Sequence, residues 1–220
     1  MTLPGGSSLN LTEILRDSLR PITHYVLWLV GLARPTTQTT EEERNCLARH
    51  AAGKRRLVEI GVWHGVTTVR LRSVMASNGL LFAVDPFPIG RLGFSLQQSI
   101  AHSEVGRVVN GDVKWLRMTG IAAAKEYATG EHEPVDFIFI DGDHSYDGLR
   151  DDWEAWSPLV APGGIVALHD SVPTAERPIH DAGSVRYTED VIRRDPRFEF
   201  IESVDSLTVM QRRLSSARAE

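Results

Sequence analysis

The stretch RLVEIGVWHG, residues 56–65, indicates the fold class of this chain of 220 residues. Its first residues predict a β-strand that ends at Gly61, and a helix is expected over residues 67–77. Glycine at a strand end lets the backbone turn sharply and lets a ligand approach closely. The helix that follows offers unpaired N–H groups and the positive end of its dipole. This order of elements predicts a ligand at the turn, although a plain tight turn also fits the pattern.

The alternation of strand and helix continues along the chain. We expect further strands at residues 80–85, 106–110, 135–140 and 165–168, helices at 94–103, 113–127 and 147–159, and a final antiparallel pair at 197–203 and 207–211. Apolar strands that alternate with helices predict an α/β fold with a doubly wound sheet, mostly parallel with an antiparallel last strand. Right-handed crossovers place the carboxyl ends of the parallel strands on one edge, where such sheets bind ligands.

Residues 1–39 are expected to form a tail and N-terminal helices that serve as a lid or an oligomer contact, and residues 40–220 form the main domain. Pro21 predicts a break, or a new first turn, within the helical stretch 11–31. The apolar run 25–33 is too short to span a bilayer, so we expect no membrane partner. Because such a run is costly to leave in water, we expect a homo-oligomer.

Charge and cysteine content exclude several classes of protein. The net charge is −5 and no stripe of Lys and Arg is present, so we expect no nucleic-acid partner. Cys46 is the only cysteine. A lone thiol excludes an internal disulfide framework and a cysteine-rich zinc site, and it fits a reducing compartment. We therefore expect a cytoplasmic protein in which Cys46 is inert.

The turn after the first strand limits the choice of cofactor. A dinucleotide fingerprint would need glycines two and five positions after Gly61, where Trp63 and Val66 stand. A nicotinamide cofactor is therefore disfavoured. Asp85 closes the second predicted strand and could accept hydrogen bonds from a ribose diol, or it could be a loop carboxylate. Asp112, after the third predicted strand, could lie near an adenine edge or cap a helix.

A second group of polar residues follows two later strands. Asp141 and His144 come after the apolar strand 135–140, and His169 and Asp170 come after the strand 165–168. Neighbouring parallel strands lie about 4.8 Å apart, so Asp141 and Asp170 could share one divalent cation. Hard oxygen ligands favour Mg²⁺ or Ca²⁺. Helix capping and turn formation are the alternative, but they do not explain two histidines.

Together these segments resemble the class I S-adenosylmethionine-dependent methyltransferases. Among them, the chain is similar to small metal-dependent O-methyltransferases of natural products, of the macrolide-sugar type. The resemblance covers residues 40–212. It depends on these segments: Val58-Glu59-Ile60-Gly61 with Gly65, Asp85-Pro86, Gly111-Asp112, Asp141-Gly142-Asp143-His144-Ser145-Tyr146, and Pro162-Gly163-Gly164. It implies a Rossmann-like sheet and transfer of a methyl group to a hydroxylated small molecule, such as a natural-product sugar or a polyketide-like acceptor.

The resemblance also implies residue roles. Glu59, Gly61 and Gly65 would line the methionine and ribose parts of S-adenosylmethionine, Asp85 would hold the ribose hydroxyls, and Asp112 would lie near the adenine. Asp141 and Asp170 would bind Mg²⁺ or another divalent cation, and His144 would be the general base. Related sugar methyltransferases carry an acidic residue where this chain has His169, which makes His169 a further candidate ligand.

Three alternatives remain open from the sequence. One is a nicotinamide-dependent oxidoreductase, and another is a non-catalytic module that binds a nucleoside. A third keeps the fold but uses Asp141, His169 and Asp170 as a non-haem iron site. The acceptor is not identified by any motif, and we expect its specificity to lie in the N-terminal helices and in the loop 171–187.

Overall fold

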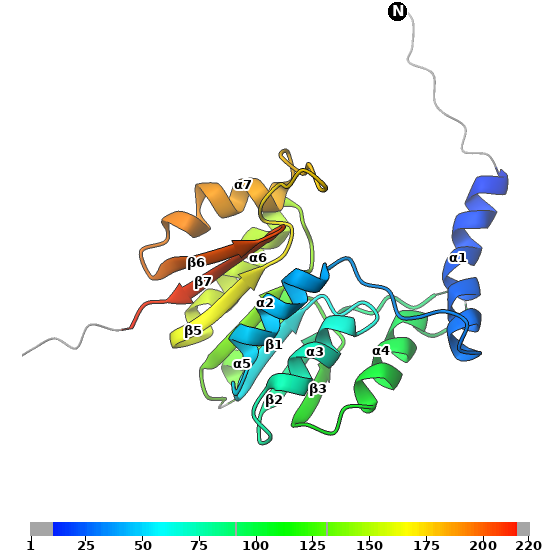
Figure 1. Cartoon of the computed structure of the whole chain (residues 1–220), viewed down its shortest axis with the longest axis horizontal. Helices are drawn as coiled ribbons and strands as arrows, with labels where there is room; N and C mark the ends of the chain where they lie inside the picture. Colours follow the sequence, from blue (N-terminus) through cyan, green and yellow to red (C-terminus); the bar gives the residue numbers. More distant parts are fainter. Residues whose placement is uncertain (1–10, 91, 131, 215–220) are drawn as a thin grey trace, which may run out of the picture.

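The computed structural model describes residues 11–90, 92–130 and 132–214, so the predicted tail at residues 1–10 lies outside the described part. Within that part, seven strands form one sheet in the order β3-β2-β1-β4-β5-β7-β6 (Figure 1). The strands are β1 (Arg56–Ile60), β2 (Leu80–Val84), β3 (Asp112–Leu116), β4 (Val135–Ile140), β5 (Val160–Leu168), β6 (Phe198–Val204) and β7 (Leu207–Arg212).

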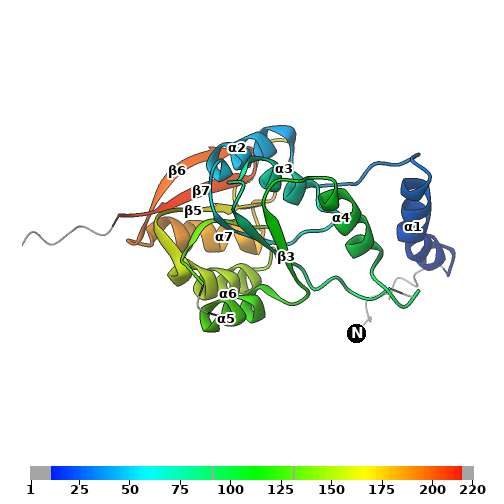
Figure 2. The same cartoon turned by 90° about the horizontal axis from the view of Figure 1, so that it is seen from below.

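Helices cover both faces of this sheet. The α-helices of the described chain are α1 (Leu11–Leu29), α2 (Glu41–Ala51), α3 (Val66–Val74), α4 (Leu96–Gly106), α5 (Gly120–Thr129), α6 (Tyr146–Trp156) and α7 (Gly183–Asp190). Figures 1 and 2 show α2, α3 and α4 over one face and α5, α6 and α7 over the other. Strands β1 to β5 pair in parallel, and β7 runs antiparallel to both of its neighbours. The predicted fold class is therefore confirmed.

The central strands are mostly apolar because helices cover both faces of the sheet. Successive side chains of a strand point to opposite faces. In β4, Phe137 and Phe139 pack in the cluster that contains Leu47 of α2, whereas Ile138 packs in the cluster that contains Trp153 of α6. Burying a side chain of this size contributes about 1.5–3 kcal/mol. These two clusters hold the strand ends in place.

The third strand differs from the prediction. Residues 106–110 are not a strand, because α4 extends to Gly106 and β3 begins at Asp112. The apolar residues of this segment do not pack in the sheet, and Val109 is 95% exposed. Asp112 pairs with Leu80, the first residue of β2. Asp112 therefore lies at the amino end of the sheet, and the predicted helix over 113–127 begins only at Gly120.

Three other elements differ in extent. The helix α1 continues through Pro21 without the expected break. The strand β5 begins at Val160 rather than at the predicted residue 165, so Pro162-Gly163-Gly164 lies inside it. That segment faces a shift of register between Val135 and Phe137 of β4, which accommodates the extra residues. The helix α7 was not predicted.

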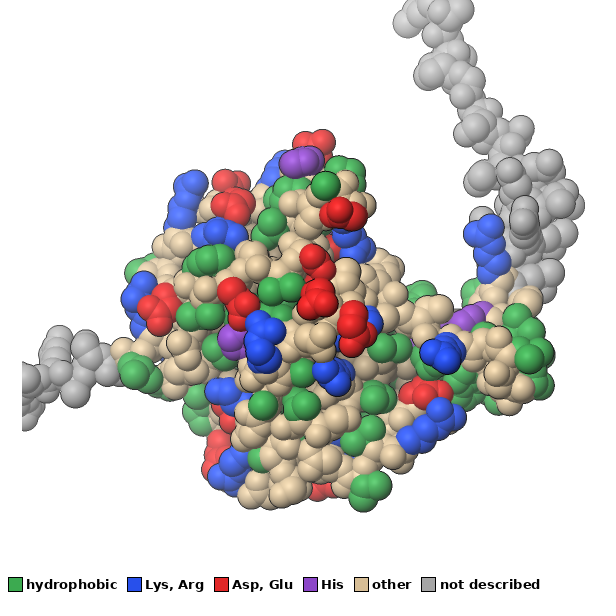
Figure 3. All heavy atoms as spheres, in the orientation of Figure 1, with side chains coloured by type: hydrophobic (Ala, Val, Ile, Leu, Met, Phe, Trp, Pro, Cys, Tyr) green, Lys and Arg blue, Asp and Glu red, His purple; other side chains and the backbone are tan. Residues whose placement is uncertain are grey.

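The helix α1 lies at one end of the molecule, beside α4 (Figures 1 and 2). Trp28 donates a hydrogen bond from Nε1 to Glu104 of α4, at 2.8 Å. Hydrophobic side chains gather at this end in Figure 3, and the exposed ones include Val26, Leu27, Leu29, Val30 and Leu32. None of the described helices combines the length and the hydropathy needed to cross a membrane. Coverage of the exposed residues by a second copy stays a prediction.

This prediction can be tested with two matched substitutions. Leu32 and Leu214 are each 77% exposed, but they lie near α1 and near the opposite end of the described chain. If α1 forms an oligomer contact, Leu32→Ser should shift the protein toward the monomer of 24.4 kDa. Leu214→Ser should not. Light scattering at micromolar concentration measures the mass, and a wild-type protein that is already monomeric would contradict the prediction.

Candidate active site

The turn after β1 depends on the absence of a side chain at Gly61. Gly61 has a φ of +90°, and a Cβ atom there would lie 2.0 Å from the carbonyl oxygen of Asp141. The N–H of Asp141 donates to the carbonyl of Ile60 at 2.7 Å, which joins the ends of β4 and β1. Trp63 also has a positive φ, of 54°. The turn is therefore tightly constrained and runs directly beside the first residue after β4.

Asp85 at the end of β2 holds this turn in place. Its Oδ2 accepts hydrogen bonds from the N–H groups of Val62 at 3.0 Å and Trp63 at 3.1 Å. Its Oδ1 accepts one from the N–H of Phe87 at 2.7 Å. A carboxylate has about four acceptor positions, so roughly one remains for a ligand hydroxyl. Asp85 thus lies where the sequence predicted it, and its role toward a ribose stays a prediction.

Two other predicted cofactor residues lie behind the turn. Glu59 is fully buried, and its oxygens have no hydrogen-bond partner of normal geometry among the described residues. Burial raises the pKa of Glu59 well above its usual range, and the nearby Thr68 hydroxyl offsets this only in part. At Gly65, a Cβ atom would lie 3.1 Å from the Cα atom of Ala101 in α4. Glu59 and Gly65 therefore support the turn from behind and do not line its open side.

A cavity of about 590 Å³ opens at the carboxyl ends of the parallel strands. Of the residues predicted for the site, Gly61, Asp85, Asp141 and His144 line it. The predicted placement of Asp112 near the cofactor is wrong, because Asp112 lies at the opposite edge of the sheet. Residues after the true end of β3 line the cavity instead, among them Met118 and Thr119. Placing the third strand at 112–116 would have identified them.

The linker between α1 and α2 contributes Thr36, Thr37 and Gln38 to the cavity wall. His64 attaches this linker to the main domain, because its Nδ1 accepts a hydrogen bond from the N–H of Thr36 at 3.1 Å. The ring of His64 stacks on that of His24 in α1, with a centroid distance of 5.1 Å. Burial, and next the neighbouring His24, lower the pKa of His64 to about 4. His64 is therefore neutral near pH 7 and can accept this bond.

Asp141, His144 and Asp170 converge at the ends of the paired strands β4 and β5. His144 Nε2 lies 3.7 Å from Oδ1 of Asp141 and 3.8 Å from Oδ2 of Asp170. Asp170 Oδ1 is buried and has no hydrogen-bond partner among the described residues. Two carboxylates and an imidazole within this space suit a divalent cation. These side chains suit the predicted cation chemically, and its binding by Asp141 and Asp170 stays a prediction.

His169 lies behind Asp141. Its Nδ1 is 2.7 Å from Asp141 Oδ1, and its Nε2 is 3.4 Å from Glu43 Oε2 of α2. Burial lowers the pKa of His169, but the hydrogen bonds to Asp141 and Glu43 outweigh it and raise the pKa to about 10. Both ring nitrogens thus face carboxylates. The ligand atoms of Asp141, His144 and His169 lie within 4.8 Å of one another, which is compatible with a shared cation. The role of His169 as a ligand stays a prediction.

Arg177 and Asp152 are further residues of the site that the sequence did not predict. Arg177, from the loop after β5, places Nη2 2.9 Å from Oδ2 of Asp170, and the same nitrogen donates to Oε1 of Gln38 at 2.8 Å. Asp152 of α6 lines the cavity, and burial raises its pKa to about 6. No local pattern marks either residue, since only the packing of loop and helix onto the sheet brings them to the cavity.

Comparison with known proteins identifies the family. The sequence matches the methyltransferase domain family over residues 58–171, which is more than half of the chain. It is 26% identical to tricin synthase 1 of Oryza sativa subsp. japonica over 220 residues, covering 91% of this chain and 81% of that protein. It is 27% identical to the uncharacterized protein y4gI of Sinorhizobium fredii over 129 residues, but spans only 14% of that protein's length.

Solved structures share the fold. The O-methyltransferase TomG of Streptomyces achromogenes, in complex with S-adenosylmethionine, matches with a TM-score of 0.62 at 16% identity over 93% of this chain and 96% of TomG. An O-methyltransferase of Bacillus cereus, in complex with S-adenosylhomocysteine, matches with a TM-score of 0.58 at 20% identity over 90% of each chain. At these identities the likeness is one of fold, and the family match carries the assignment: the chain belongs to the class I S-adenosylmethionine-dependent methyltransferases.

Proposed function

We propose that this protein transfers the methyl group of S-adenosylmethionine to a hydroxyl oxygen of a small molecule, with the help of a divalent cation. The convergence of Asp141, His144 and Asp170 beside the cavity is the main support. Two similar proteins are named O-methyltransferases, which supports oxygen as the acceptor atom. Membership of the methyltransferase family argues against a nicotinamide-dependent oxidoreductase and against a non-catalytic module.

The turn after β1 and the end of β2 would hold the cofactor. When bound, S-adenosylmethionine supplies an electrophilic methyl group on a sulfonium. Gly61 leaves room for close approach of a ligand to the backbone. The remaining acceptor position of Asp85 would take a ribose hydroxyl, and Met118 and Thr119 would contact the adenine in place of Asp112.

The second half of the site would bind the acceptor. A cation held by Asp141 and Asp170 would lower the pKa of a substrate hydroxyl and fix its direction. His144, 38% exposed at its side chain, lies between these carboxylates and can take the hydroxyl proton and release it to water. His169 and Glu43 would fix the orientation of Asp141 from behind, as partners of metal-binding groups commonly do.

Cofactor binding is tested by calorimetry with S-adenosylhomocysteine. We expect micromolar affinity for the wild-type protein, about −8 kcal/mol. Asp85→Ala should weaken binding by about 1.5–3 kcal/mol, the range for hydrogen bonds to a charged group. Asp112→Ala is the matched control and should leave binding unchanged, since Asp112 lies at the other edge of the sheet. A wild-type protein that does not bind would overturn the proposal.

The metal requirement is tested by assays with a panel of hydroxylated natural products. EDTA should abolish methylation and Mg²⁺ should restore it. Asp141→Asn and Asp170→Asn should each remove most activity but leave cofactor binding largely intact, because each loses a charged oxygen ligand. Asp147→Asn changes an exposed carboxylate on α6 and should have no such effect. Full activity in EDTA after exhaustive dialysis would refute the role of the cation.

The two histidines should behave differently. His144→Ala should reduce kcat about 10²–10⁴-fold, the usual contribution of general acid–base catalysis. His169→Ala should weaken the binding of Mg²⁺ by about 10–100-fold if the ring orients Asp141. His169→Asn can keep a donor where Nδ1 now lies and should recover much of this loss. If His169→Asn binds Mg²⁺ no better than His169→Ala, His169 ligates the metal directly.

A further inference from the structure

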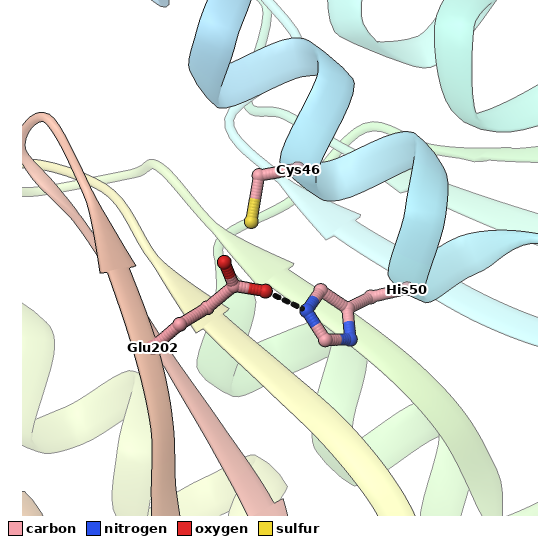
Figure 4. Close-up of side chains that lie close together, drawn as sticks. All are labelled: Cys46, His50 and Glu202. Carbon is pink, nitrogen blue, oxygen red and sulfur yellow. Dashed lines mark hydrogen bonds and ion pairs between the residues drawn. The ribbon is translucent and has the colours of Figure 1, made fainter.

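A second cluster of ligand atoms lies away from the cavity, between α2 and the edge strand β6. Cys46 and His50 of α2 and Glu202 of β6 each offer one ligand atom, and these atoms lie within 4.8 Å of one another. Figure 4 shows the sulfur of Cys46 and the ring of His50 both directed toward the carboxylate of Glu202. His50 Nε2 lies 2.7 Å from Glu202 Oε1. The proposed reaction uses none of these groups.

We propose that Cys46, His50 and Glu202 bind a thiophilic divalent cation, for which Zn²⁺ is the best fit, and that this cation joins α2 to β6.

The spacing of the two helix residues supports a metal site. Residues four apart on a helix lie on the same face, one turn above the other, as in helical zinc motifs. A thiolate, an imidazole and a carboxylate suit Zn²⁺, whereas Mg²⁺ and Ca²⁺ prefer oxygen alone. Three protein ligands leave one tetrahedral position for water. The cluster needs only one cysteine, so it is compatible with Cys46 being the only one in the chain.

The three ligand residues of this cluster differ in their exposure to solvent. Cys46 is completely buried, whereas the side chains of His50 and Glu202 are 18% and 33% exposed. A cation can therefore enter from solvent and meet the sulfur last. Tetrahedral ligands of zinc lie roughly 3.3–3.8 Å apart, so the three side chains need only small rotations to close around it.

Arg49 is the competitor for Glu202. Its Nη2 donates to both carboxylate oxygens, at 3.0 and 2.9 Å. Its side chain is 58% exposed, so it can turn into water when a divalent cation takes its place. Exposed ion pairs of this kind contribute little to stability. Arg49 therefore lowers the affinity of the site for a cation but does not prevent the cation from binding.

Titration with Co²⁺, a spectroscopic substitute for Zn²⁺, tests the proposal. A cobalt–thiolate bond gives a charge-transfer band in the near ultraviolet. Cys46 is the only cysteine, so the band reports this cluster alone even if Co²⁺ also binds at Asp141 and Asp170. The reduced, metal-free full chain should develop the band with one equivalent of Co²⁺ at this cluster, and Zn²⁺ should abolish it. Absence of the band would overturn the proposal.

Variants separate a built site from chance binding to a thiol. His50→Ala and Glu202→Gln should each weaken Co²⁺ binding, read from the band, by at least tenfold. Arg49→Ala should strengthen it, a gain that misfolding cannot produce. The double variant Asp141→Asn, Asp170→Asn should keep the band unchanged. A band that is unaffected by His50→Ala, Glu202→Gln and Arg49→Ala would show that only the thiol binds, and would refute the site.

Discussion

The contact between Gly61 and Asp141 is the constraint on which the site depends. Any side chain at Gly61 would collide with the carbonyl oxygen of Asp141. The contact exists because β1 and β4 are neighbours in parallel register, with Ile60 opposite Ile140. It brings the turn that would hold the cofactor against the carboxylate that would hold a cation. Backbone packing would thereby bring methyl donor and methyl acceptor together.

The sequence was most informative where strands are buried on both faces. Apart from Asp136, the strand β4 is an apolar run because helices cover it on each side, and its predicted bounds agree with the observed ones. The edge strand β3 was misplaced for the opposite reason. Its residues include Lys114 and are mostly half-buried, so its pattern is weak. The apolar pair Val108-Val109 gave a stronger but misleading signal, which placed Asp112 at the wrong edge of the sheet.

Some residues of the candidate site could likewise be predicted from the sequence, and others could not. Asp141, His144 and Asp170 could be predicted because each follows the end of a recognisable strand, and parallel strands end on one edge. Glu43 and Arg177 could not, because α2 and the loop after β5 reach the site only through tertiary packing. The four-residue spacing of Cys46 and His50 is visible in the sequence, but their partner Glu202 lies about 150 residues further along and is brought near by β6.

The bond between His64 and Thr36 makes the cavity wall sensitive to protons. An imidazole in an unfolded chain titrates near pH 6.5, whereas burial and the neighbouring His24 lower the pKa of His64 to about 4. Between these values the unfolded chain binds more protons than the folded chain. His64 therefore contributes stability that is complete above about pH 6.5 and is lost progressively as the pH falls toward 4. Protonation of Nδ1 would remove the acceptor of the bond from Thr36, so the acid stability of the fold is linked to the wall of the cavity.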